Sequence, residues 1–211
     1  KAGISLQKSK DQLLCRASNF PLDIFLVRDD DIPAFLVNDV CQLGIIGQNS
    51  LLETQRLEPE IYGGLDEVVR LGFGRCRLSI AVPNDMVYEG VQSLAGRTIA
   101  TSYRGLLAQF LAANGVAADI VTMEGAVEVA PRTHLADAIC DLVSTGNTLT
   151  SNGLSEKDII LESQAVIIQN SVIQDDLKLL CETLLARINA VLRAENCLLY
   201  TSDAADEELR V

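Results

Sequence analysis

Short runs of apolar residues, separated by polar and glycine-containing turns, cover most of this sequence. Runs of about four to eight apolar residues bounded by turn residues are typical of buried β-strands. We therefore predict strands at 22–27, 42–47, 76–83, 98–103 and 118–123, with further strand-like runs within 136–143 and 158–170. The longer amphipathic stretches between them indicate a mixed α/β protein.

Three stretches follow a helical pattern instead. Asp31 followed by Pro33 is typical of a helix start, with the aspartate as N-cap and the proline in the first turn. Residues 105–115 place apolar side chains on one face and end at Gly115. Residues 175–195 repeat leucine, isoleucine and valine every three or four positions, which predicts an amphipathic helix roughly 30 Å long at about 1.5 Å per residue.

The order of these elements predicts the architecture. A helix between the strands at 22–27 and 42–47 predicts that these two strands pair in parallel. The alternation of strands and helices continues along the chain and predicts two α/β lobes. We expect the lobes at 1–82 with 165–196, and at 83–164.

The composition narrows the classes of function. With 48% hydrophobic residues the chain can bury a core, and no apolar run reaches the ~18 residues of a membrane helix. A net charge of −12 argues against nucleic acid or an anionic membrane as a partner, although backbone N–H groups can still bind a small phosphate. Six cysteines without a CxxC pair indicate a reduced, cytoplasmic protein. The single histidine, His134, makes a zinc site or a Cys–His nucleophile pair hard to build.

The segment DLVSTGNTL (141–149) combines one carboxylate with a loop of small hydroxyl residues around a glycine. Ligands of open α/β sheets bind outside the carboxyl ends of the strands, where this loop is expected. Gly146 allows a phosphate to approach the backbone, and the following helix start favours an anion. Asp141 suits sugar hydroxyls rather than a phosphate. The segment therefore predicts a ribose-5-phosphate site, and the alternative is an ordinary strand-to-helix turn.

Other candidate residues each have a structural alternative. Arg28, followed by three aspartates, is placed either to pair with a phosphate or simply to end a strand before a capped helix. Glu128 is a candidate second acid, and Arg132 a candidate anion ligand; alternatively the two form a buried salt bridge. Tyr103 follows a predicted strand and could either stack on a base or lie in the core.

With these segments in order, the sequence resembles the ATP phosphoribosyltransferase family over roughly residues 1–195. The resemblance rests on VRDDDIP (27–33), LGIIGQN (43–49), GRCRLSIAVP (74–83), RTIATSY (97–103) and GAVEVAPRTHLADAICDLVSTGNTL (125–149). The last segment carries the family signature at Glu128, Ala136, Ile139, Asp141, Leu142, Thr145, Gly146, Thr148 and Leu149. Matches at so many fixed spacings are far more specific than a lone glycine-rich loop.

The resemblance implies a two-lobed, periplasmic-binding-protein-like (type II) α/β fold with mixed sheets and a long C-terminal helix. It implies a pentosyltransferase that joins N1 of ATP to 5-phosphoribosyl 1-pyrophosphate and releases pyrophosphate with Mg²⁺, the first step of histidine biosynthesis. The 5′-phosphate would be held by Ser144, Thr145, Gly146, Asn147 and Thr148. Asp141 would hold the ribose, and positive charge developing on the sugar makes Asp141 and Glu128 the expected catalytic acids. Arg28, Arg132 and Tyr103 are further expected substrate ligands, and no residue is assigned as a metal ligand.

The sequence also departs from the family. Glycine is usual where His134 stands, so we expect a solvent-facing variant there rather than a catalyst. Gln7-Lys8-Ser9-Lys10 resembles the family's first basic loop but lies too close to Arg28, and we interpret it as a hairpin turn. The resemblance thus implies a long-form member truncated at both ends, with little activity as it stands, and a homo-oligomer (dimer to hexamer) when intact. Residues 197–211 do not fit the pattern and are interpreted as a non-native tail.

A second class of function uses the same fold. Solute-binding proteins and ligand-sensing domains clamp a small anion between two such lobes without chemistry. Asp141 beside the 144–148 loop favours the enzyme, because a simple anion clamp needs no ribose-binding acid.

Overall fold

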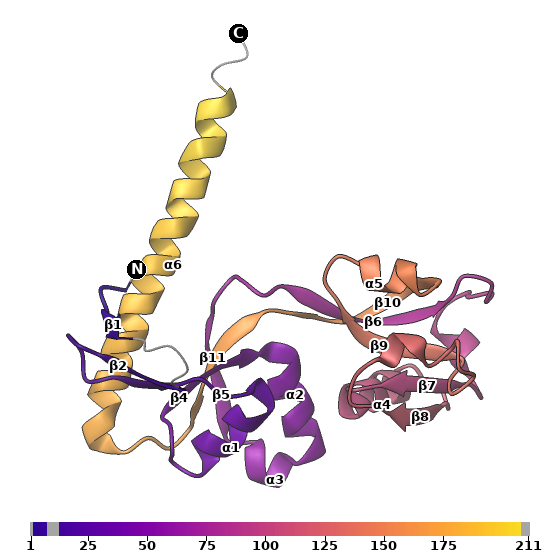
Figure 1. The fold of residues 1–211 in the computed structure, drawn as a ribbon, viewed down its shortest axis with the longest axis horizontal. Coiled ribbons are helices and arrows are strands. Elements are labelled where there is room, and N and C mark those ends of the chain that lie inside the picture. The colour runs from indigo at the N-terminus through magenta and orange to yellow at the C-terminus, as the bar shows by residue number, and fades with distance from the viewer. Residues whose placement is uncertain (1, 8–12, 208–211) are drawn as a thin grey trace. The chain divides into compact units, whose positions relative to one another are not determined.

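The computed structural model describes residues 2–7 and 13–207, with side chains up to residue 195 (Figure 1). Its contacts divide the chain into two compact units. The first unit comprises residues 1–46, 64–72 and 166–211, and the second comprises residues 47–63 and 73–165. Neither unit is one continuous stretch of chain.

Among its described residues, the first unit holds two small sheets and three helices. One sheet has the order β1-β2-β3, with β1 (Leu6–Gln7), β2 (Leu14–Ala17) and β3 (Asp23–Phe25) antiparallel. The other has the order β4-β11-β5, from β4 (Leu43–Gly47), β11 (Ala165–Asn170) and β5 (Leu65–Arg70). The helices are the 3-10 turn η1 (Asp29–Asp31), α1 (Ile32–Val37) and the long α6 (Asp175–Glu207). The Arg187 guanidinium of α6 lies 4.9 Å from the centre of the Phe20 ring, which ties the helix to this unit.

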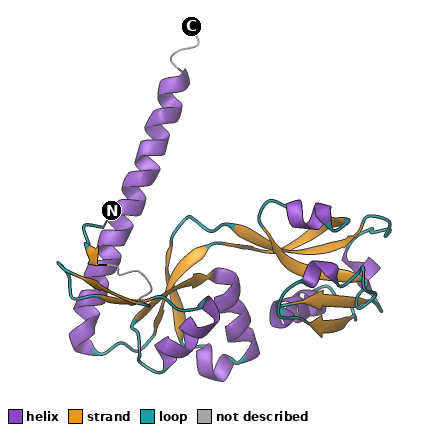
Figure 2. Cartoon of the chain, in the orientation of Figure 1, coloured by secondary structure: helices purple, strands orange, loops and turns teal. Residues whose placement is uncertain are grey.

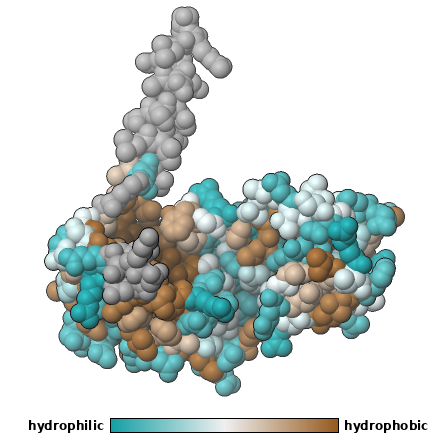
Figure 3. Space-filling view, in the orientation of Figure 1, coloured by the Kyte–Doolittle hydropathy of each residue, from teal (hydrophilic) through white to brown (hydrophobic). Residues whose placement is uncertain are grey.

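The strand predicted at 22–27 differs from expectation in two ways. It does not pair with the strand at 42–47, because β3 pairs with β2 while β4 pairs with β11, so the predicted parallel pairing is wrong. It is also not buried: Phe25, Leu26 and Val27 are 43%, 41% and 36% exposed. Figure 3 shows apolar surface on the part of the molecule that holds the first unit.

The start of α1 also differs from the prediction. Asp31 lies in helical geometry at the end of η1 and makes no side-chain capping hydrogen bond. The three aspartates instead form a 3-10 turn continuous with the helix, where their negative charge still favours the N-terminal end. Pro33 lies in the first turn, as predicted.

The predicted hairpin turn at residues 7–10 falls mostly on residues that the structure does not describe. Its flanks agree with the interpretation, since β1 pairs antiparallel with β2 at Leu6–Ala17 and Gln7–Arg16. Residues 8–10 themselves lie outside the described residues.

The second unit is built around a five-stranded mixed sheet with the order β10-β6-β9-β7-β8. Its strands are β6 (Cys76–Pro83), β7 (Thr98–Thr101), β8 (Asp119–Thr122), β9 (Ala138–Val143) and β10 (Leu154–Ser163). β7 runs parallel to β8 and β9, whereas β6 runs antiparallel to β9 and β10. Its helices are α2 (Gln48–Leu57), α3 (Pro59–Tyr62), η2 (Val91–Leu94), α4 (Arg104–Ala113), η3 (Val127–Val129) and α5 (Asn147–Ser151), shown in purple beside the orange strands in Figure 2.

Alternating side chains of this sheet fill two separate cores. Along β6, Leu78, Ile80 and Val82 are fully buried in a cluster with α4, while Ala81 belongs to the cluster on the other face with η3 and α5. Along β9 the same alternation puts Cys140 on the α4 face. Residues 139, 141 and 143 share the opposite face, so Asp141 lies on the side of η3 and α5.

The predicted strands of this sheet are confirmed, β6 over its whole predicted range, and so is the helix that ends before Gly115. The grouping of contacts differs from the predicted lobes at residues 47–63, which carry α2 and α3, and at residues 73–82, which carry most of β6, because both stretches fall in the second unit. β6 was counted with the first lobe, but it pairs along its length with β9 and β10 at the centre of the second unit.

Candidate active site

The loop after β9 is a set of exposed donors at one edge of the five-stranded sheet. Gly146 adopts φ 81°, a left-handed conformation that favours glycine, and this turn starts α5 at Asn147. The Asn147 N–H points toward the Thr145 hydroxyl at 3.5 Å. Within residues 2–7 and 13–207, no protein group accepts the N–H of Thr145, Gly146 or Thr148. These amides are therefore free to bind an anion.

Asp141 and Glu128 come together on the face of the sheet that carries this loop. The Asp141 carboxylate is half-buried and accepts a hydrogen bond from the Leu142 N–H at 2.8 Å. Burial raises the pKa of Asp141 above its ordinary value, the Leu142 hydrogen bond lowers it, and the negative charge of Glu128 raises it further. Glu128 projects from η3, which packs against β9. The two acids predicted from the sequence thus interact electrostatically.

A cluster that sequence reasoning missed lies under the same loop. The Arg77 guanidinium of β6 makes a two-pronged pair with the Glu156 carboxylate of β10, through Nε and Nη2. The Ser79 hydroxyl donates to the same carboxylate at 2.7 Å. The remaining guanidinium nitrogen of Arg77, Nη1, donates to the Ser144 carbonyl at 3.3 Å. Only the antiparallel register of three strands brings these residues together, so spacing along the chain gave no signal.

Helix α2 supports the neighbouring turn after β7. The buried Glu53 carboxylate accepts the N–H groups of Gly105 at 2.7 Å and Leu106 at 2.8 Å, and so caps α4 from outside. The Asn49 amide donates to the Tyr103 hydroxyl at 3.0 Å. Tyr103 is half-buried and packs on the α4-side core, so its hydroxyl is fixed at the edge of the sheet where β9 also ends.

Two predicted arginines lie elsewhere. Arg28 is exposed in the first unit, immediately before η1. Arg132 lines a hollow of about 910 Å³ at the opposite edge of the five-stranded sheet, where Thr98 begins β7. Arg132 is exposed and forms no ion pair with Glu128 among the described residues, so the alternative of a buried salt bridge is wrong.

His134 lines the same hollow as Arg132 and is exposed, as predicted. Its backbone has φ 57°, a left-handed conformation that side chains other than glycine rarely adopt. This conformation explains why glycine suits the position.

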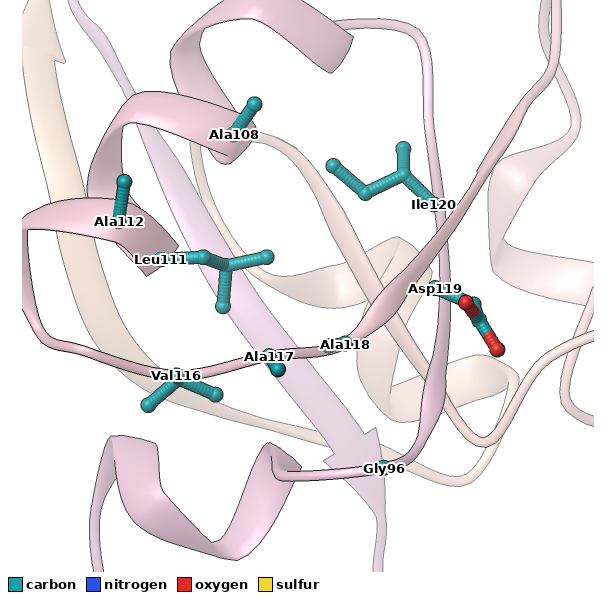
Figure 4. Close-up of a pocket in the computed structure, with 9 residues that line it drawn as sticks. All are labelled: Gly96, Ala108, Leu111, Ala112, Val116, Ala117, Ala118, Asp119 and Ile120. Atoms are coloured by element: carbon teal, nitrogen blue, oxygen red, sulfur yellow. The ribbon is translucent and has the colours of Figure 1, made fainter.

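A second hollow, of about 420 Å³, lies between α4 and β8 (Figure 4). It is lined by small and aliphatic side chains such as Ala108, Ala112 and Ile120, and Figure 4 shows the Asp119 carboxylate turned away from the alanines of α4. It lacks the convergent polar groups of a catalytic site. The loop after β9, with its free amides beside the half-buried Asp141, is the candidate site.

Two kinds of feature are absent from the described part of the chain. No helix there is both long and apolar enough to cross a membrane. No group of three or more histidine, cysteine, aspartate or glutamate side chains there is placed to hold a metal ion.

The fold is that of a two-unit α/β class shared with proteins similar to periplasmic binding proteins. A histidine kinase sensor domain similar to periplasmic binding proteins superposes with a TM-score of 0.54 at 16% identity, over 84% of this chain and 74% of the other. A chain of an ATP phosphoribosyl transferase (HisG:HisZ) complex from Thermotoga maritima gives a much closer match, with a TM-score of 0.74 at 25% identity, over 92% of this chain and 90% of the other.

The sequence comparisons decide between these two. The family model "HisG: ATP phosphoribosyltransferase" matches residues 28–190. ATP phosphoribosyltransferase of Phocaeicola vulgatus is 41% identical over 210 residues, 100% of this chain and 72% of that protein. The Bacteroides thetaiotaomicron protein of the same name is 43% identical over 93% of this chain and 67% of its own length. The chain belongs to the ATP phosphoribosyltransferase family, and a purely ligand-binding role is not favoured.

Proposed function

We propose that this chain carries the catalytic site that condenses ATP with 5-phosphoribosyl 1-pyrophosphate, giving N1-(5-phosphoribosyl)-ATP and pyrophosphate in the first step of histidine biosynthesis. Family membership supports the reaction. The assignment of the site to this loop is supported by the free backbone amides of Thr145, Gly146 and Thr148 next to the half-buried Asp141.

The loop and the acids have separate roles in this proposal. The amides and hydroxyls of residues 144–148 bind the terminal 5′-phosphate, which is the fixed end of the sugar. Asp141 accepts hydrogen bonds from the ribose hydroxyls. As the bond to pyrophosphate lengthens, positive charge builds on the anomeric carbon, and the carboxylates of Asp141 and Glu128 stabilise it. Attack by N1 of ATP then completes the transfer, so no covalent nucleophile is needed.

Tyr103, Arg28 and Arg132 have a weaker claim to substrate contact. The fixed hydroxyl and half-exposed ring of Tyr103 support its proposed stacking on the adenine. Arg28 and Arg132 remain predictions from the sequence, and the position of Arg132 at the opposite sheet edge does not favour contact with the 144–148 loop.

The donor set suits Mg²⁺ carried in with the substrate. Mg²⁺ prefers oxygen ligands and commonly takes one or two carboxylates, with waters and substrate phosphates completing its shell. Asp141 and Glu128 are carboxylates of this kind. When bound, Mg²⁺ would neutralise the leaving pyrophosphate.

We also propose a cytoplasmic homo-oligomer. The cysteines among the described residues are free thiols, as in reduced compartments. The Thermotoga maritima relative was solved as a HisG:HisZ complex, which supports assembly with further subunits.

Calorimetry with 5-phosphoribosyl 1-pyrophosphate and Mg²⁺ tests the site. Gly146→Val should weaken binding by at least about tenfold, because a branched side chain is strained at this φ and fills the space of the phosphate. Thr145→Ala should weaken it by about three- to tenfold through the lost hydroxyl. Thr133→Ala, another exposed threonine at the opposite sheet edge, should leave binding unchanged. Unaltered affinity in both loop variants would remove the assignment.

A further inference from the structure

The Arg77 guanidinium is the one cation that the structure places in contact with the loop after β9, among the described residues. It does not face outward as a free charge. Two of its nitrogens are occupied by Glu156, and the third reaches the Ser144 carbonyl at 3.3 Å. The guanidinium therefore spans from the sheet to the first residue of the loop.

The peptide link between Ser144 and Thr145 connects this contact to the free amides. A trans peptide unit is planar, and its C=O and N–H point in opposite directions. Holding the Ser144 oxygen on Arg77 therefore directs the Thr145 N–H away from Arg77. That N–H donates to no group in the described part of the chain.

Glu156 makes the arrangement rigid. Its carboxylate accepts hydrogen bonds from two Arg77 nitrogens and from the Ser79 hydroxyl. The pairing with Arg77 lowers the pKa of Glu156 below its ordinary value. The carboxylate is therefore charged at neutral pH. A planar guanidinium held at two points leaves its last nitrogen with a fixed direction, which a flexible lysine ammonium lacks.

We propose that Arg77 is a positioning residue for phosphate binding: through the Ser144 carbonyl it aims the Thr145 amide at the 5′-phosphate, and Glu156 fixes Arg77 in that role. This inference rests on the proposed function of the loop. It assigns to Arg77 no direct contact with the substrate. Its effect should fall on the phosphate end of the ligand and spare the sugar end.

The probes are ribose 5-phosphate and ribose, titrated by calorimetry into the whole chain and its variants. Arg77→Lys should weaken ribose 5-phosphate by about tenfold, the size of about 1.4 kcal/mol, because the charge stays but the fixed direction is lost. Arg77→Met should weaken it to a similar extent. Glu156→Gln, which keeps one acceptor for Arg77, should have a smaller effect in the same direction. Binding of ribose should not change in any of them.

Arg97→Lys is the matched control. Arg97 likewise donates to a backbone carbonyl, that of Ser93 at 3.0 Å, and lies near a carboxylate, Asp137 at 3.8 Å, but at the opposite edge of the sheet. Its variant should bind ribose 5-phosphate as the wild type does. Thermal melting identifies any variant that has lost its fold. If the Arg77 variants do not fold, the affinity of Glu156→Gln for ribose 5-phosphate tests the proposal instead.

The outcomes are separable. If the wild type binds no ribose 5-phosphate, the proposed function of the loop falls, and this inference falls with it. If the wild type binds it and Arg77→Lys binds equally well, only the inference is overturned. An equal loss of ribose binding would show a general distortion of the site and would also overturn it.

Discussion

At the scale of single residues, Asp141 is held where its charge is disfavoured. Burial and Glu128 raise its pKa, and the Leu142 hydrogen bond offsets this only in part. An acid with a raised pKa binds its proton more tightly in the folded state, so the folded state loses stability as pH rises from the ordinary pKa to the raised one. Above the raised pKa the penalty is constant. The geometry suits a group that has to meet positive charge on a substrate.

Asp141→Asn should therefore raise the melting temperature at neutral pH and lower enzymatic turnover. Asparagine keeps the oxygen that accepts the Leu142 N–H but carries no charge. The difference in melting temperature from the wild type should shrink near about pH 3, where the aspartate is protonated in both states. A variant that is less stable than the wild type at neutral pH would contradict the stated cause of the shift.

His134 gives a prediction that concerns stability alone. Its φ of 57° costs a side-chain-bearing residue about 1 kcal/mol, and glycine avoids this strain while gaining freedom in the unfolded chain. His134→Gly should raise the free energy of unfolding by roughly 0.5 kcal/mol in urea titrations. His134→Ala keeps the strain and should show no gain. A gain of the same size for alanine would place the effect in the imidazole instead.

At the scale of elements, α2 acts on the site by holding the start of α4. Glu53 caps two N–H groups of α4, and Gly105 lets the helices approach: a Cβ there would lie 3.0 Å from the Arg56 Cβ and 3.2 Å from the Glu53 carboxylate. Since Tyr103 immediately precedes α4, the same contacts set its place at the sheet edge.

Glu53→Ala should lower the free energy of unfolding by about 2–4 kcal/mol, because two amide N–H groups lose their acceptor in a buried place. Glu89→Ala, an exposed glutamate of the same unit, should cost less than about 0.5 kcal/mol. Urea titration measures both. Equal costs would mean that water replaces the carboxylate at no penalty.

Some elements were predictable from the sequence, whereas α2 was not. Strands β6 and β9 of the second unit were predictable because their runs are mostly apolar and buried, as central strands require. Helix α2 was missed because its buried positions include Asn49, Ser50 and Glu53, polar residues whose burial depends on partners distant in sequence. The strand at 22–27 was wrongly predicted as buried for the converse reason, since apolar residues do not by themselves specify a partner.

The candidate site divides along the same line. Asp141 and the 144–148 loop form one continuous segment, so the chain itself fixes their relation. Arg77 and Glu156 are 79 residues apart and meet only through strand register, which a single sequence does not reveal. Arg132 was grouped with Glu128 because it is near in sequence, yet the turn after Pro131 leads back to the start of β9.

At the scale of the whole molecule, the two units are woven from one chain. It passes between them at 46/47, 63/64, 72/73 and 165/166. Helix α2 thus reaches the second unit from a strand of the first, and β10 of the second leads into β11 of the first. Because each unit consists of several separate stretches of chain, cleavage at a single peptide bond cannot separate one unit from the other. Folding of each unit therefore depends on contacts between residues far apart in sequence.

Cys140 lies in the middle strand of the five, fully buried and one position before Asp141. Alkylating reagents can reach its sulfur only after β9 separates from its neighbours. The rate of Cys140 alkylation therefore reports how often the five-stranded sheet opens. Any compound that binds the adjacent loop should lower the rate of Cys140 alkylation in proportion to the fraction of sites occupied, whether or not turnover takes place.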